Sequence, residues 1–286
     1  MTNNSTSYTV GIDVGSTYTK ALILDEDYQI ASKAMVNTGF KLGQAAGQAL
    51  QAALLEAGLE EDDVAYIVAT GFGRHQVPFR DVNVTDMTAS ARGASFLFPG
   101  TRTILDVGGQ TMKAIRLDDD IKVKSFRLND KCAAGTGAFL EKTARYMGFA
   151  TEEIGPLAAT SKETVPISGV CAVFAESEVI NHLSQGAAPA DIMYGSIVSL
   201  VGRSVQLMKR VRMEPEFTLI GGILRFETMA QVVRQELRAH VNVPEGDLVQ
   251  YTSALGAAIL GHRRLQKLQA ENSSFVRSGR SAIAQV

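Results

Sequence analysis

Two stretches of the chain share one pattern of apolar and polar positions. Residues 10–24 (VGIDVGSTYTKALIL) and 103–117 (TILDVGGQTMKAIRL) each read as an apolar run, Asp-Val-Gly, small or polar residues, Lys, and a second apolar run. An apolar run that ends in Asp and Gly before a second such run predicts a β-hairpin. Since the two stretches match at one constant offset, they indicate an internal duplication better than they indicate two unrelated hairpins.

The spacing of apolar residues elsewhere predicts alternating helices and strands. The predicted elements are a helix over 43–59, a strand within 62–74 that enters a Gly-rich turn, helices at about 134–148, 171–185 and 190–211, a strand over 217–222, and a final helix over 253–268 whose small residues allow close packing. This order predicts an α/β protein with two halves, each built on one hairpin. The expected domains are residues 1–98 completed by the final helix, residues 99–252, and a flexible tail over 269–286.

Composition narrows the classes of function. The 286 residues are 45% hydrophobic and carry a formal net charge of −2 with acidic and basic residues well mixed, so neither a nucleic acid nor an anionic membrane is an expected partner. There is no apolar run of the roughly 20 residues that a membrane-spanning helix needs, and the polar beginning MTNNSTSYTV carries no signal pattern. We expect a cytoplasmic protein.

The first hairpin carries residues suited to binding phosphate. Gly15, Ser16 and Thr17 lack bulk, so an anion can approach their backbone N–H groups, while Asp13 is placed to hold a magnesium ion through water. If Lys20 returns toward the turn, its ammonium group adds positive charge near the β- or γ-phosphate. The alternative for Lys20 is an exposed strand lysine.

The second hairpin offers a matching set of residues: Asp106, Gly108, Gly109, Gln110 and Thr111. The Gln110 amide has the chemistry to orient the water that attacks a γ-phosphate. One Asp-x-Gly turn alone predicts only a tight turn. Two copies on duplicated hairpins predict a pair of phosphate clamps, with Asp13, Asp106 and Gln110 as the candidate catalytic residues.

A pair of glycines follows the predicted strand near residue 220. In LIGGILRF, Gly221 and Gly222 leave room for a purine or ribose to lie against the backbone. They are therefore candidate adenosine contacts, although Gly-Gly after a strand is more often only a turn.

The two cysteines of the chain, Cys132 and Cys171, each stand just before or at the start of a predicted helix. A helix N-terminus lowers a thiol pKa and stabilises an anionic metal–sulfur centre. An all-thiolate zinc site or a [4Fe–4S] cluster needs four thiolates, so two chains together would supply one such site. From the residues alone, two small buried hydrophobic side chains remain the commoner alternative.

The motifs together resemble one known family. The chain is similar to the activators of 2-hydroxyacyl-CoA dehydratases and the related ATPase subunits of benzoyl-CoA reductase, in the superfamily of actin, heat-shock chaperones and sugar kinases. The resemblance covers about residues 8–266 and is carried by GIDVGSTYTK, ATGFGR, DVGGQ, NDKCAAGTGAFLE, CAVFAESEVI and ALGAA. It implies duplicated, ribonuclease H-like α/β domains with a nucleotide cleft between them.

The resemblance also implies the cofactors and the site. It assigns Cys132 and Cys171 to half of a [4Fe–4S] cluster that bridges two subunits. It assigns Ser16, Thr17 and Lys20 to the ATP phosphates, Gln110 to the γ-phosphate, and the segment Gly135-Thr136-Gly137 to the neighbourhood of the nucleotide. ATP binding and hydrolysis would rotate the helices that hold the cluster. An electron from a donor such as ferredoxin would then pass to an iron–sulfur acyl-CoA dehydratase or reductase of anaerobic metabolism.

One departure from the family pattern bears on the alternatives. After Gly221-Gly222 this chain reads Ile223-Leu224-Arg225-Phe226, where dehydratase activators carry a short polar stretch with Asn. Together with the long C-terminal tail, this departure slightly favours a subunit of an aryl-CoA reductase over a stand-alone activator. The cluster would be shared in a homodimer or, in a reductase, in a heterodimer with a paralogous subunit. The alternatives on the same fold are a small-molecule kinase and a nucleotide-gated module without turnover.

Overall fold

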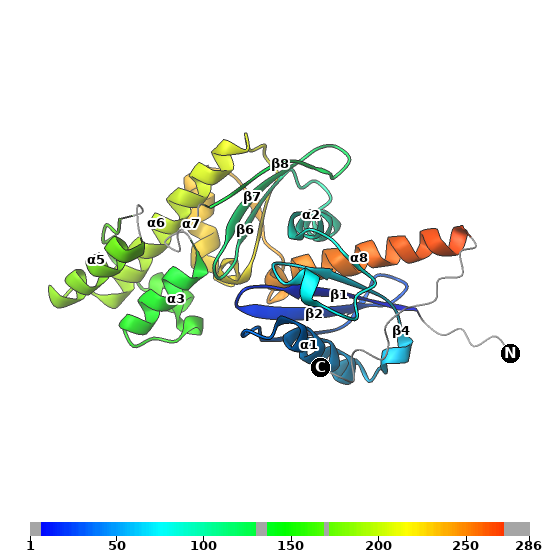
Figure 1. The fold of residues 1–286 in the computed structure, drawn as a ribbon. Helices are drawn as coiled ribbons and strands as arrows, with labels where there is room; N and C mark the ends of the chain where they lie inside the picture. The colour runs from blue at the N-terminus through cyan, green and yellow to red at the C-terminus, as the bar shows by residue number, and fades with distance from the viewer. Residues whose placement is uncertain (1–6, 130–135, 169–171, 272–286) are drawn as a thin grey trace. The chain divides into compact units, whose positions relative to one another are not determined.

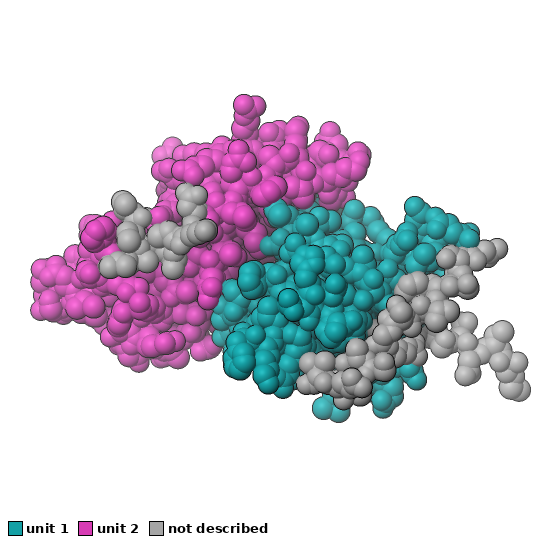
Figure 2. All heavy atoms as spheres, in the orientation of Figure 1, with its two compact units in different colours: residues 1–99, 251–286 teal, residues 100–250 magenta. Residues whose placement is uncertain are grey.

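The computed structural model describes residues 7–129, 136–168 and 172–271. The chain divides into two compact units, one made of residues 1–99 and 251–286 and the other of residues 100–250 (Figure 2). Each unit carries its own sheet and its own buried core.

The first unit is built on a five-stranded sheet in the order β3-β2-β1-β4-β5 (Figure 1). Its strands are β1 (Tyr8–Val14), β2 (Tyr18–Leu24), β3 (Ile30–Asn37), β4 (Val64–Thr70) and β5 (Val82–Asn83). Its helices are α1 (Leu42–Ala57), α2 (Asp86–Leu97) and most of α8 (Leu248–Ala270), with short 3-10 turns η1 (Glu61–Asp63) and η2 (Arg74–Gln76). β1 pairs antiparallel with β2 and parallel with β4.

The second unit is built on a five-stranded sheet in the order β10-β9-β6-β7-β8. Its strands are β6 (Thr103–Val107), β7 (Met112–Leu117), β8 (Val123–Leu128), β9 (Phe217–Ile220) and β10 (Val241–Asn242). Its helices are α3 (Gly137–Tyr146), α4 (Ile154–Ala159), α5 (Ala172–Ser184), α6 (Pro189–Arg210) and α7 (Glu227–Leu237), with 3-10 turns η4 (Thr151–Glu153) and η5 (Gly222–Arg225). β6 pairs antiparallel with β7 and parallel with β9.

The two sheets have the same topology. In each, three consecutive strands pair antiparallel and the first of them also pairs parallel with a fourth strand, which pairs parallel with a fifth. β1 and β6 therefore hold equivalent places, as do β2 and β7. The duplication predicted from the two hairpin sequences is confirmed by this order of strands.

The predicted elements are present, with changes at their ends. The strand predicted over 217–222 stops at Ile220, because Gly221 has φ +104° and Gly222 begins a 3-10 turn. The final helix begins at Leu248, five residues before its predicted start, and continues to Ala270. Most of the tail predicted over 269–286 lies outside the described residues.

Small residues bring α8 close to its neighbours in the first unit. A Cβ atom built on Gly11 of β1 would lie 1.9 Å from the Ala254 carbonyl oxygen, and one built on Gly256 would lie 1.9 Å from the Ala89 carbonyl oxygen of α2. The close packing predicted from the small residues of this helix is confirmed. Since both neighbours are backbone atoms, neither contact can relax by a side-chain rotation.

We expect Gly11→Ala to lower the melting temperature, because the new methyl group overpacks β1 against α8 and costs about 1–3 kcal/mol. Gly202→Ala is the matched control, since a Cβ atom there meets nothing within 4 Å and α6 gains helix propensity. Thermal unfolding followed by circular dichroism compares the two variants. Equal melting temperatures would contradict the close approach.

Among the described residues, no helix is both long enough and apolar enough to span a membrane.

Candidate functional site

The first hairpin turn is closed by its own backbone. The Gly15 N–H donates to the Tyr18 carbonyl oxygen at 3.1 Å, and a Cβ atom on Gly15 would lie 2.7 Å from that oxygen. The turn therefore requires glycine at this position. Because the Gly15 N–H is used inside the turn, the expected anion contacts reduce to the N–H groups of Ser16, which is exposed, and Thr17.

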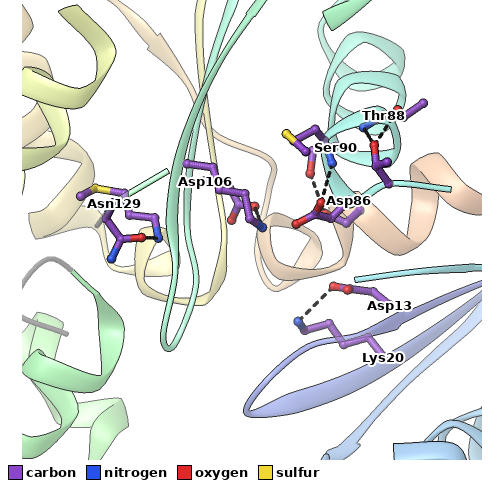
Figure 3. A network of polar contacts seen from close by, with 12 residues as sticks. Asp13, Lys20, Asp86, Thr88, Ser90, Asp106 and Asn129 are labelled. Atoms are coloured by element: carbon purple, nitrogen blue, oxygen red, sulfur yellow. Dashed lines mark hydrogen bonds and ion pairs between the residues drawn. The ribbon is translucent and has the colours of Figure 1, made fainter. Parts of the chain in front are cut away.

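Asp13 and Lys20 face each other across this hairpin. They are partners in the register of β1 and β2, and Lys20 Nζ lies 3.5 Å from Asp13 Oδ2 (Figure 3). The lysine side chain is 15% exposed and the aspartate side chain 13%. Lys20 is therefore not an exposed strand lysine, and its charge lies beside the carboxylate at the base of the turn.

Two loops of the first unit are fastened to the same turn. The Thr38 N–H donates to the Thr17 carbonyl oxygen at 2.9 Å, and the Gly73 N–H donates to the Val14 carbonyl oxygen at 2.9 Å. Gly71 has φ +85°, and a Cβ atom there would lie 2.4 Å from Asp13 Oδ1. The loop that carries the sequence ATGFGR therefore packs directly against the Asp13 carboxylate.

The second hairpin repeats this geometry. The Gly108 N–H donates to the Thr111 carbonyl oxygen at 2.8 Å, and Asp106 and Lys113 are cross-strand partners whose Oδ2 and Nζ atoms lie 3.0 Å apart (Figure 3). Gln110 at the tip is exposed. The Gln110 side chain is thus accessible at the turn, while the carboxylate of Asp106 is largely buried beneath it.

The first turn of α3 rests on this second hairpin. The Gly137 N–H donates to the Gly108 carbonyl oxygen at 3.0 Å, and the Ala138 N–H donates to the Gly109 carbonyl oxygen at 2.7 Å. Thr136, at the N-cap, is fully buried, so in this conformation its side chain has no exposed surface for a ligand. Gly135 lies outside the described residues. Of the predicted Gly-Thr-Gly segment, Gly137 is therefore bonded to the hairpin turn.

The segment after β9 converges on the same end of β6. The Gly221 N–H donates to the Val249 carbonyl oxygen at 2.9 Å, and a Cβ atom on Gly221 would lie 2.3 Å from the Val107 carbonyl oxygen. At Gly222 the nearest atom would be Gln250 Oε1 at 3.6 Å, an ordinary contact. The structure thus requires glycine at position 221 and tolerates a side chain at position 222.

We expect Gly221→Ala to lower the melting temperature strongly, because it combines a left-handed backbone with a clash against the β6 backbone. Gly222→Ala, one residue along, is expected to melt with the wild type. Differential scanning calorimetry on both variants makes the comparison. A stable Gly221→Ala variant would contradict this part of the site.

The cysteines predicted as metal ligands, Cys132 and Cys171, lie outside the described residues. The helices that follow them are described: α5 begins at Ala172, immediately after Cys171, and α3 begins at Gly137. Among the described residues there is no group of three or more His, Cys, Asp or Glu side chains that would hold a metal ion by themselves.

An ion pair joins the two helices that follow the cysteines. Lys142 Nζ of α3 lies 2.7 Å from Glu176 Oε2 of α5, and the Tyr146 hydroxyl donates to the same oxygen at 3.4 Å. The hydrogen bond to Glu176 raises the pKa of Lys142. Since Lys142 is half exposed, the pair stabilises the unit little and serves mainly to orient α3 against α5.

Sequence reasoning missed three features of the site. The sequence aligned Lys113 with Lys20 but did not indicate its ion pair with Asp106. It indicated a Gly-rich turn around Gly71 but not the contact of that turn with Asp13. Asn129 accepts the Met112 N–H at its Oδ1 at 2.7 Å and returns its own N–H to the Met112 carbonyl oxygen at 2.9 Å (Figure 3). It therefore fixes the chain to β7 shortly before Cys132. The Asn-Asp pair in NDKC was the available signal.

Comparison with known proteins gives a consistent picture. A model of the BadF/BadG/BcrA/BcrD ATPase family matches residues 10–261. The chain is 41% identical over 261 residues to the activator of lactoyl-CoA dehydratase of Anaerotignum propionicum, covering 91% of this chain and 99% of that protein. It is 35% identical over 274 residues to one of the subunits of the benzoyl-CoA reductase of Thauera aromatica, covering 91% of this chain and 95% of that subunit.

Solved structures agree with the sequence matches. The activator of the 2-hydroxyisocaproyl-CoA dehydratase from Clostridium difficile, solved with bound ADPNP, has a TM-score of 0.88 at 35% identity and covers 94% of this chain and 99% of its own. A ROK family glucokinase from Streptomyces griseus has a TM-score of 0.57 at 18% identity, covering 90% and 99%. The second match shows the fold alone, and confirms the predicted actin and sugar-kinase type of architecture.

Proposed function

This chain belongs to the BadF/BadG/BcrA/BcrD ATPase family, and we propose that it hydrolyses ATP to drive low-potential electron transfer to an acyl-CoA dehydratase or an aryl-CoA reductase. The observation that carries the proposal is the pair of equivalent hairpin turns, each with a largely buried Asp–Lys pair, in a chain similar over nine-tenths of its length to dehydratase activators. A structural neighbour was solved with bound ADPNP, which supports ATP as the ligand.

The first turn would bind phosphate through its backbone and one lysine. Ser16 and Thr17 present N–H groups at a glycine-closed turn, and Lys20 stands beside it. Backbone N–H groups and a lysine are the usual partners of nucleotide phosphates. The hydrogen bond from the Thr38 N–H to the Thr17 carbonyl oxygen would keep the turn in place when phosphate binds.

The second turn would carry the hydrolytic group. Gln110 is exposed at the tip of a turn that Gly108, Gly109 and the start of α3 hold rigid. Its amide can accept a hydrogen bond from the attacking water and direct that water at the γ-phosphate, without an acidic base. Gly222, beside Gln250, leaves an open backbone where adenosine can lie.

The carboxylates fit a magnesium ion bound together with nucleotide. Mg²⁺ commonly takes one or two protein carboxylates and completes its shell with water and phosphate oxygens. Asp13 in the first unit and Asp106 in the second are each a candidate ligand for this ion, directly or through water. When bound, Mg²⁺ supplies charge neutralisation at the transferred phosphoryl group.

Cys132 and Cys171 would hold half of a [4Fe–4S] cluster, with a second copy or a paralogous subunit giving the other half. Two thiolates from each of two chains give the four that such a cluster needs, and each stands shortly before a helix, whose N-terminus favours an anionic centre. When bound, the cluster supplies the one-electron chemistry. Within the second unit, the hydrogen bonds from α3 to Gly108 and Gly109 and the Lys142–Glu176 pair form a continuous route from the phosphate turn to α5.

The relatives bear on the choice between activator and kinase. Those at 30% identity or more that have functional names are dehydratase activators or a reductase subunit, whereas the kinase match at 18% identity shows fold only. The partner would therefore be the acyl-CoA enzyme, and the electron donor a ferredoxin-like protein.

We expect Gln110→Ala to lower the rate constant of ATP hydrolysis on the order of 100-fold or more while leaving the affinity for ADPNP unchanged, since only the orientation of the water is lost. Gln231→Ala, which removes an exposed glutamine on α7, is the control. Phosphate release and calorimetric titration measure the two quantities. Wild-type turnover in Gln110→Ala would remove this residue from the mechanism.

Purification without oxygen should give about two irons and two acid-labile sulfides per chain, because one four-iron cluster is shared by two chains. Reduction with dithionite should give an electron paramagnetic resonance signal that Cys132→Ser and Cys171→Ser each abolish. Iron analysis after anaerobic reconstitution is the check. If no iron is retained, the electron-transfer part of the proposal fails while the ATPase part stands.

A further inference from the structure

Lys113 is a charged residue of the second hairpin that the function proposed above leaves without a role. Its Nζ atom lies 3.0 Å from Asp106 Oδ2, and the two side chains are 13% and 11% exposed. An ammonium group and a carboxylate withdrawn from water to this degree need each other, because removing either one leaves a poorly solvated charge. The pair therefore brings two opposite, poorly solvated charges together beneath the turn.

The duplication assigns Lys113 the place of Lys20. Both lysines follow the turn on the second strand of the hairpin, and both are cross-strand partners of the aspartate that precedes it. Both ammonium groups lie within 3.5 Å of that aspartate. Lys113 can therefore make the same ionic contact with a phosphate group at the second turn that Lys20 would make at the first turn.

We propose that Lys113 is a second phosphate-binding residue, stored on Asp106 in the nucleotide-free chain and released from it when Mg·ATP binds. The inference rests on the proposed function, because it concerns the same nucleotide. Lys113 gives up its place beside the carboxylate to the magnesium ion and turns its ammonium group to a phosphate oxygen. Nucleotide binding at this turn is then an exchange of cations on Asp106.

Three physical features favour the exchange. A hard divalent cation binds a carboxylate more strongly than an ammonium group does, and two cations on one carboxylate repel each other. Mg·ATP remains an anion, so the displaced ammonium group finds a new partner nearby. Lysine has a flexible four-carbon stem and three donors, which allows it to change partners without moving the backbone.

The N–H groups at the tip of the turn are available to bind a nucleotide phosphate close to Lys113. The Gly108 N–H is used within the turn, whereas in the described part of the chain the N–H groups of Gly109, Gln110 and Thr111 make no hydrogen bond. The base of the turn is held by the α3 N–H groups on the Gly108 and Gly109 carbonyl oxygens. A phosphate bound at the tip therefore lies above a rigid base that carries the Asp106–Lys113 pair.

Lys113→Met in the full-length protein tests the exchange with two probes. The first is Mn²⁺ binding to the nucleotide-free protein, followed by electron paramagnetic resonance; the affinity should rise about 10-fold, because the competing ammonium group is gone. The second is the ratio of ADPNP to ADP affinity in the presence of Mg²⁺, which should fall about 10-fold, because a phosphate contact is lost. Lys113→Gln repeats both measurements with an amide that can still donate to Asp106, in case the methionine variant fails to fold.

Lys122→Met is the matched control, since Lys122 makes an exposed ion pair with Asp120 in the same unit and both quantities should stay at wild type. If either quantity is unchanged in a folded Lys113 variant, the cation exchange is overturned. A wild-type protein that binds no ADPNP would instead overturn the proposed function, so the two failures are distinguishable.

Discussion

The ion pair between an aspartate at the end of a buried strand and a lysine on the next strand is the interaction on which the candidate site depends. It occurs once in each unit, at 3.5 Å for Asp13 and Lys20 and at 3.0 Å for Asp106 and Lys113. The pair lets a carboxylate stand beneath a tight turn, because the ammonium group beside it balances its charge. In the proposed function it also places a positive charge where a phosphate group would approach, so one cross-strand register would supply both a metal ligand and an anion partner.

Backbone hydrogen bonds turn this local feature into a connected unit. In the second unit, the carbonyl oxygens of the hairpin turn accept the first N–H groups of α3, and α3 is joined to α5 through Lys142 and Glu176. Gly221 packs on the Val107 carbonyl oxygen from the other direction. A displacement of the turn would therefore act on the start of α3, whose own hydrogen bonds make it stiff along its length. These contacts are the physical basis of the proposed coupling between the nucleotide and the cysteine segments.

Much of the fold could be predicted from local pattern, whereas an exposed edge strand and the contacts between elements could not. The hairpins were predicted because an apolar run, Asp-Val-Gly and a second apolar run recur, whereas β8 (VKSFRL) was missed because it is an edge strand with exposed Phe126 and Leu128. α7 was missed although Met229, Val232 and Val233 recur at helical spacing. The pairing of Lys113 with Asp106 could not be predicted without the length of the turn, which sets the register of the two strands. The hydrogen bond from Gly137 to Gly108 could not be predicted either, because it is a tertiary contact that the spacing of residues does not encode.

In the proposed function, the state of the nucleotide at the phosphate turns controls the segments that carry the cysteines. The direct measurement is the rate at which an iron chelator removes iron from the anaerobically purified protein with ADP or with ADPNP bound. The rate is expected to differ several-fold between the two nucleotides, and Glu176→Ala, which removes the oxygen that accepts from Lys142 and Tyr146 and so breaks the link between α3 and α5, is expected to reduce the difference. Equal rates of iron removal with both nucleotides would contradict the proposed coupling.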